Sequence, residues 1–156
     1  ESLCTSAASW LEPYLMGITK NEELKKLNIS QFLWHSLSFD LQQELDRIAP
    51  SHLVVPSGSE IAIHYQEDGS SPRLSVRLQE LFGMLETPKV NRGRIPILIE
   101  LLSPGYKPVQ LTRDLKSFWT SGYFEVKKEL KQRYPKHSWP EDPIQAQAVR
   151  GVKKRE

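Results

Sequence analysis

Cysteine is almost missing from this chain, whose 156 residues include only one, Cys4. A single thiol excludes an internal disulfide and a cysteine-based metal cage, and it fits a reducing compartment, so we expect a cytoplasmic protein. Long hydrophobic runs are missing too. The strongest run, Ile95 to Leu102, is interrupted by Pro96 and Glu100 and is far shorter than the roughly 20 residues of a membrane-spanning helix. We therefore expect no membrane partner.

The motifs of common catalytic sites are also lacking. The eight glycines are scattered, and none belongs to a Gly-x-x-x-x-Gly-Lys-Ser/Thr phosphate loop or a Gly-x-Ser-x-Gly elbow. The four histidines show no metal-ligand spacing, so we expect no metal site. The neighbouring carboxylates of Glu141 and Asp142 lie between prolines, where a solvated loop is the usual structure. We expect a chain that is no enzyme, binds no cofactor and does not hydrolyse ATP by itself.

Positive charge gathers near the end of the chain. Residues 107–156 carry 12 Lys and Arg against 6 Asp and Glu, whereas residues 1–106 carry 9 against 13. Such an asymmetry is typical of a protein that meets an anionic partner or that ends in a basic tail. Because Lys153, Lys154 and Arg155 follow a stretch of small residues, we expect residues 144–156 to form an exposed basic tail.

Residues 1–50 predict a block of short helices. From Ala8 to Leu15, apolar residues recur at helical spacing. Asn21 stands where an N-cap would, before two acidic residues that suit the first turn of a helix. A further apolar stripe ends before Pro50, and its members are Leu41, Leu45 and Ile48.

Residues 51–111 change to the period of two that is typical of strands. Ile61 and Ile63 alternate with polar neighbours, residues 67–72 have turn composition, and Leu74 and Val76 alternate after it. This pattern predicts an antiparallel hairpin. Residues 87–102 predict a second one around the turn residues 91–94. We expect an antiparallel β region, with a short helical turn between the hairpins that closes at Gly83.

A helical stripe from Leu115 to Tyr134 dominates residues 112–143, with Thr112 as the expected N-cap and Pro135 after its end. Gly122 weakens a helix interior, so one helix and a helix pair both remain open. The order of helices, strands and helices predicts an α+β fold: an N-terminal helical block, antiparallel hairpins, and a C-terminal helix or helix pair followed by a proline-rich segment.

The segment Arg133 to Pro143, which we call the strap, combines three prolines with two aromatic rings and several cations. One interpretation is a nucleic-acid contact, in which cations bind phosphates and a base stacks on Tyr134 or Trp139. The interpretation we favour is structural: both rings anchor a proline-stiffened segment on the domain while its charges face water.

Cations upstream of the strap allow the same two interpretations. Lys127, Lys128 and Lys131 interleave with Glu125 and Glu129, a pattern typical of a solvated helix face. If the chain does bind nucleic acid, we expect phosphate contacts from the cations and stacking from the indole of the following residues: Arg113, Lys127, Lys128, Lys131, Arg133, Lys136 and Trp139.

Five segments, the strap among them, follow one another in a distinctive order. They are Val55-Pro56-Ser57-Gly58, Arg77 through Gly83, Leu101-Leu102-Ser103-Pro104, Pro108 through Leu115 with Phe118-Trp119, and the strap. In this order they closely resemble the C-terminal region of the bacterial ATP-dependent RNA helicases of the HrpB family, which are DExH-box proteins of superfamily 2. The likeness covers about residues 50–150, with the helical block in the expected place before it.

This resemblance implies a fragment of a larger motor, and the start at Glu1 rather than Met fits that expectation. The family binds ATP and RNA through two RecA-like domains, whose motifs have no counterpart here. The resemblance therefore implies ATP and Mg as cofactors of the parent only, motor domains in cis as partners, and no catalytic residue in this chain.

Two hypotheses follow for the fragment itself. In the first, it is a non-catalytic accessory module that assists RNA binding through its basic C-terminal face. In the second, it is a docking module that packs on the helicase core or on another protein without touching RNA. The second rests on an apolar content of the helical block that exceeds what a small helical cap needs, in particular the rings of Trp10, Tyr14, Trp34 and Phe39.

Overall fold

The chain divides into two units, which we call the helical unit, Glu1–Asp46, and the sheet unit, Arg47–Glu156. The structure is a computed structural model that describes residues 5–152. No helix among these residues has the length and hydrophobicity that would let it span a membrane.

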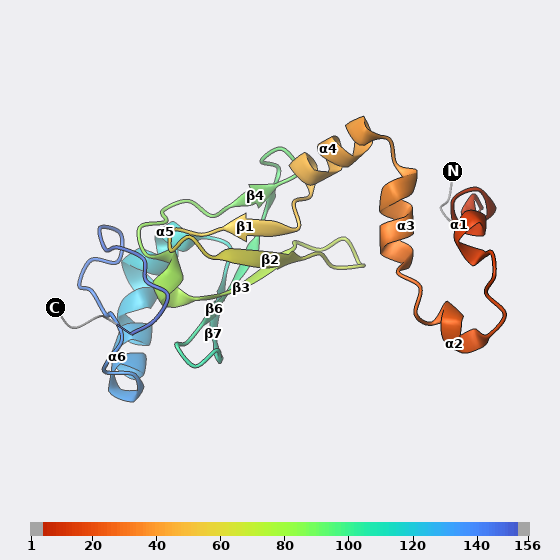
Figure 1. Cartoon of the computed structure of the whole chain (residues 1–156). Helices are drawn as coiled ribbons and strands as arrows, with labels where there is room; N and C mark the ends of the chain where they lie inside the picture. Colours follow the sequence, from red (N-terminus) through yellow and green to blue (C-terminus); the bar gives the residue numbers. More distant parts are fainter. Residues whose placement is uncertain (1–4, 153–156) are drawn as a thin grey trace. The chain divides into compact units, whose positions relative to one another are not determined.

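Four short helices make up the first part of the chain, as expected (Figure 1). They are α1 (Ala7–Leu15), α2 (Asn21–Leu24), α3 (Ile29–Ser36) and α4 (Phe39–Ile48). Helices α1 and α3 pack through the rings of Tyr14 and Phe32, whose centroids are 3.8 Å apart and whose planes differ by 9°. None of the described side chains of the helical unit is fully buried, so this unit lacks a closed core of its own.

A five-stranded sheet forms the centre of the sheet unit. Its strands are β1 (His52–Val54), β2 (Glu60–His64), β3 (Arg73–Arg77), β6 (Leu98–Leu102) and β7 (Pro108–Thr112), in the order β1-β2-β3-β6-β7. The expected hairpin is present, since β2 and β3 are antiparallel with Ile63 opposite Leu74. Alternate residues of β3 are buried, as the period of two predicted.

The pairing of β3 with β6 corrects our expectation of a purely antiparallel region. These two strands are parallel, with Leu74 opposite Ile99 and Val76 opposite Leu101. Parallel neighbours need a long crossover, and residues 78–97 supply it. This crossover contains a 3₁₀ turn, η1 (Leu78–Leu81), and a separate two-stranded sheet of β4 (Lys89–Val90) and β5 (Ile95–Pro96). The second hairpin is thus real but ends at Pro96.

The C-terminal helical segment changes its helix type near Gly122, where one helix and a helix pair were both open. It comprises α5 (Leu115–Ser117), a π-helical stretch η2 (Phe118–Gly122) and α6 (Tyr123–Arg133). Gly122 lies at the junction, where an added Cβ would approach the Phe118 ring to 3.0 Å. The expected N-cap is wrong by two residues: the Asp114 side chain caps the helix by accepting from the Ser117 amide, and Thr112 accepts from the amide of Asp114.

The core joins the sheet, η1, α6 and the strap. Phe82, Trp119 and Tyr123 are buried in mutual edge and tilted contacts, and the Trp119 indole donates to the Met84 carbonyl. The segment after the strap also belongs to this body, because the main-chain amide of Val149 donates to the Gln79 carbonyl. Apolar side chains of this segment pack against the core, namely Ile144, Ala146 and Ala148.

Residues 144–149 thus differ in part from the exposed tail that we expected: Gln145 and Gln147 are exposed, whereas Ile144, Ala146 and Ala148 pack against the core. The basic cluster Lys153-Lys154-Arg155 lies outside the described residues.

Candidate nucleic-acid interface

Trp139 anchors the strap and offers no open face. Its side chain is 9% exposed and belongs to the hydrophobic core, and its Nε1 donates to the Tyr134 carbonyl at 2.8 Å. A base needs an open ring face for stacking, and an indole that is nine-tenths buried does not offer one. The structure therefore contradicts a stacking role for Trp139 and favours the structural interpretation of this ring.

Lys127 is also occupied. Its side chain lies on the side of α6 that faces the core and is 8% exposed. The Nζ atom donates to the Pro140 carbonyl at 3.0 Å and lies 2.6 Å from Oε1 of Glu141. The hydrogen bond from Lys127, followed by its charge, lowers the pKa of the Glu141 carboxyl. Lys127 thus fastens the strap to α6, and our expectation of a phosphate contact from it is wrong.

Lys128 and Lys131 remain exposed and share a flank of α6 with Phe124. At 3.6 residues per turn, these three residues follow one another at steps of about one turn. The Phe124 ring is 48% exposed, which is high for a large apolar side chain outside the core. We call Phe124, Lys128 and Lys131 the Phe124 strip. It brings an aromatic face and two cations to one surface.

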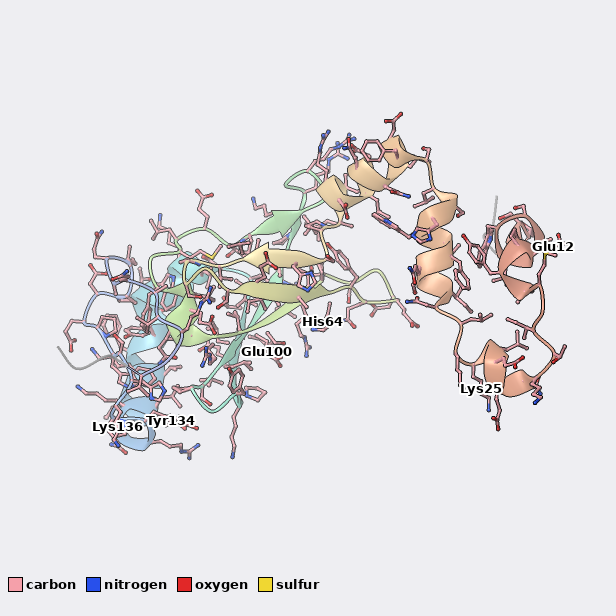
Figure 2. All side chains as sticks on the ribbon, in the orientation of Figure 1. Glu12, Lys25, His64, Glu100, Tyr134 and Lys136 are labelled. Atoms are coloured by element: carbon pink, nitrogen blue, oxygen red, sulfur yellow. The ribbon has the colours of Figure 1, made fainter. Side chains whose placement is uncertain are left out.

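Arg133 and Lys136 lie elsewhere, at the end of α6. Both line a groove of about 270 Å³, together with Tyr134, His137 and two apolar residues, Pro135 and Val152. Figure 2 labels Tyr134 and Lys136 at this end of the helix. Burial, and after it the charge of Arg77, lowers the pKa of His137, so that a neutral imidazole faces this groove at neutral pH.

Arg113 belongs to a third place. It lines a groove of about 440 Å³ between the crossover and the start of α5, whose other lining residues are Leu85, Glu86, Thr87, Lys89, Asp114 and Lys116. The seven predicted residues therefore do not form one continuous face. Five of them are exposed and fall into three groups: Lys128 with Lys131, Arg133 with Lys136, and Arg113 alone. The other two, Lys127 and Trp139, attach the strap to the domain.

Sequence reasoning missed a buried carboxylate that connects the turn before β2 with the end of β3. Glu80, in η1, is 4% exposed. Its Oε1 accepts from Nε of Arg77 at 2.8 Å, and its Oε2 accepts from Oγ of Ser57 at 2.9 Å. Burial alone would raise the pKa of Glu80, but hydrogen bonds from Ser59, Arg77 and Ser57, with the charge of Arg77, leave it below its ordinary value.

The guanidinium group held by Glu80 also meets an exposed ring. Cζ of Arg77 lies 4.9 Å from the ring centroid of Tyr106, in the turn between β6 and β7. Neither Arg77, Glu80 nor Tyr106 was assigned a role from sequence. The signal that could have found two of them was the Arg77 to Gly83 segment, which carried the family resemblance but has no general chemical motif.

Among residues 5–152, no group of three or more His, Cys, Asp or Glu side chains is arranged to hold a metal ion.

Comparison with known proteins identifies the family. Residues 10–143 match the family model HrpB_C, which is described as the ATP-dependent helicase C-terminal region. The chain belongs to this family. It is 47% identical over 154 residues to the ATP-dependent RNA helicase HrpB of Escherichia coli (strain K12), a match that covers 99% of this chain and 19% of that protein. The resemblance seen in the sequence is thereby confirmed.

Solved structures agree with this assignment. A crystal structure of the E. coli DExH-box NTPase HrpB matches with a TM-score of 0.86 and 47% identity, over 95% of this chain and 18% of that one. A crystal structure of the E. coli DEAH/RHA helicase HrpB matches with a TM-score of 0.69 and 46% identity, over 88% and 17%. The chain thus spans about a fifth of the HrpB relatives and corresponds to their C-terminal helicase domain.

We expect the Glu80 carboxylate to make the stability of this HrpB-type domain depend on pH, because folding lowers its pKa. Glu80→Gln keeps the side-chain shape but removes the charge that Arg77 and Ser57 bind. We expect the free energy of unfolding at neutral pH to fall by about 1–3 kcal/mol. Because folding lowers the pKa of Glu80, the wild-type advantage is present above the ordinary value of 4.5 and disappears as the pH falls through the folded-state value.

Urea unfolding of both proteins over a series of pH values measures this difference. Glu67→Gln is the matched control, because Glu67 is exposed in the β2–β3 turn and its replacement should change the free energy by less than about 0.5 kcal/mol. A gap between wild type and Glu80→Gln that persists unchanged at acidic pH would contradict the assigned role of the carboxylate.

Proposed function

We propose that this domain is a non-catalytic accessory module of an ATP-dependent RNA helicase and that it helps the parent protein to hold RNA. Motor domains in cis would bind ATP with Mg and supply the hydrolysis, since the chain itself carries no phosphate loop. The domain would contribute a rigid surface near the path of the RNA. This proposal takes the helicase activity named for the HrpB relative as that of the parent.

The Phe124 strip is the observation that carries the proposal. Two ammonium groups spaced along one flank of α6 suit successive phosphates, and an exposed ring beside them suits a base or a ribose. Helix α6 is well fixed for this purpose, because Tyr123 and Leu130 on its other side are buried in the core. Arg113, Arg133 and Lys136 are exposed as well, in the two other groups of cations.

The double variant Lys128→Gln/Lys131→Gln tests this proposal. We expect weaker binding of single-stranded RNA by the 156-residue chain and a salt dependence whose logarithmic slope is shallower by about 1.4, because each phosphate contact on a single strand contributes about 0.7. Fluorescence anisotropy over a salt series measures both quantities.

Lys25→Gln/Lys26→Gln is the matched control for charge, since both lysines are exposed in the helical unit. It should leave the slope close to that of wild type. Equal losses in the two double variants would mean that only net charge matters, and an unaltered slope in the first would contradict a role for the strip.

The helical unit supports a second function, docking on the motor domains. No described side chain there is fully buried, and Phe39 in α4 is 70% exposed. Leu41 and Leu45, four residues apart in the same helix, are exposed as well. Apolar side chains left without a core are typical of a segment that packs on another surface. In the parent protein, the motor domains would belong to the same polypeptide and would therefore be the nearest available partner.

Phe39→Ser/Leu45→Ser should abolish co-elution of the chain with separately expressed motor domains of the parent in gel filtration, while its RNA affinity stays unchanged. Leu111→Ser, which alters a half-exposed leucine of β7 in the sheet unit, is the control and should still co-elute. If wild type fails to co-elute, or if the control is lost as readily, the docking role of the helical unit is contradicted.

A further inference from the structure

The turn between β6 and β7 holds a tyrosine in an unusual conformation. Tyr106 has a φ of +59°, in the left-handed region that side chains other than glycine and asparagine rarely adopt. Its neighbours impose this conformation: the Tyr106 amide donates to the Ser103 carbonyl at 2.9 Å, and the Ser103 amide donates to the Lys107 carbonyl at 2.8 Å. A third bond, from the Lys107 amide to Oγ of Ser103, closes the turn. Such enforced outliers are concentrated at functional positions.

Despite this cost, the ring of Tyr106 is not used to fill the core. It is 66% exposed. The guanidinium group of Arg77 lies against it, 4.9 Å from the ring centroid. Arg77 is itself held by the buried carboxylate of Glu80 and is largely covered. The ring is thus supported by a fixed cation and presents its remaining surface to solvent.

A second cation adjoins Tyr106 in the sequence. Lys107 is the next residue and is exposed. The strap lies against the same turn, because the hydroxyl of Tyr134 is 2.6 Å from the position that a Cβ on Gly105 would occupy. Tyr134 also lines the groove of Arg133, Lys136 and His137. The turn and the strap therefore bring an exposed aromatic ring and several positive charges to one end of the sheet unit.

We propose that Tyr106 is a stacking platform for a nucleobase of single-stranded RNA, with Lys107 and Lys136 placed to meet the neighbouring phosphates. A flat exposed ring beside flexible cations is the arrangement by which proteins bind single strands without reading their sequence. A protein partner would instead call for an apolar pocket around the ring, whereas the neighbours of this ring are the guanidinium group of Arg77 and the exposed Lys107. This inference rests on the proposed function, because it adds a second RNA contact to that of the Phe124 strip.

Tyr106→Gly is the decisive variant, because it removes the ring and also relieves the backbone, which glycine adopts at this φ without cost. Its thermal unfolding should occur at or above the wild-type temperature, as followed by circular dichroism. Tyr106→Phe keeps the ring and is the matched control. The probe is a single-stranded RNA of about 12 nucleotides, compared with a version of equal length whose nucleotides lack bases.

Fluorescence anisotropy on the 156-residue chain should show Tyr106→Gly binding the base-bearing RNA about ten-fold more weakly than wild type, whereas Tyr106→Phe stays close to wild type. On the abasic RNA, which keeps the phosphates, wild type and Tyr106→Gly should bind equally. This equality would establish that the lost interaction is stacking on the base.

The other outcomes are distinguishable. If wild type binds RNA and Tyr106→Gly binds it equally well, the platform is wrong and the proposed function stands. If Tyr106→Gly loses affinity equally for both RNAs, the ring does not stack on a base. Loss of co-elution with the motor domains, with RNA affinity retained, would make the turn a protein contact and overturn the inference. If wild type binds no RNA, the proposed function fails together with it.

Discussion

A single buried carboxylate, that of Glu80, connects the segments that give the sheet unit its surface. It binds the turn before β2 through Ser57 and the end of β3 through Arg77. Ser57 in turn accepts from Nε of Arg150, so the segment after the strap is attached to the same point. A buried charge is tolerated only where its oxygens are fully bound, which makes these partners mutually dependent. The exposed ring of Tyr106 rests on this network because Arg77 lies beneath it.

Burial divides the residues that sequence reasoning assigned to RNA binding into two kinds. Lys127 binds the strap, because its ammonium group donates to the Pro140 carbonyl and forms an ion pair with Glu141, and Trp139 packs in the core. These two residues maintain the shape of the domain, whereas Lys128 and Lys131 remain open to an anionic partner. A stiff α6 with a covered inner face is a suitable support for such contacts. The helical unit contrasts with it, since its apolar side chains lack a core and suit a packing surface.

Much of the secondary structure followed from periodicity, because helices and hairpins depend on residues close in the sequence. The short helices and the β2–β3 hairpin were predicted in this way. The parallel pairing of β3 with β6 was not, because it depends on a crossover of residues 78–97 that no local pattern reveals. Glu80 was missed because a lone glutamate is usually exposed. The roles of Lys127 and Trp139 also could not be decided from the sequence. They depend on the path of the strap, which determines which side of α6 is covered and which rings of the strap are buried.

RNA is proposed to bind the sheet unit, and photo-crosslinking tests this proposal most directly. RNA that contains 4-thiouridine would be irradiated with the 156-residue chain, and the crosslinked peptides would be identified by mass spectrometry. We expect crosslinks at the aromatic rings of the two exposed cationic surfaces, Tyr106 and Phe124, and none above background in residues 5–46. Crosslinks confined to residues 5–46, or an absence of crosslinks from both rings, would contradict the account.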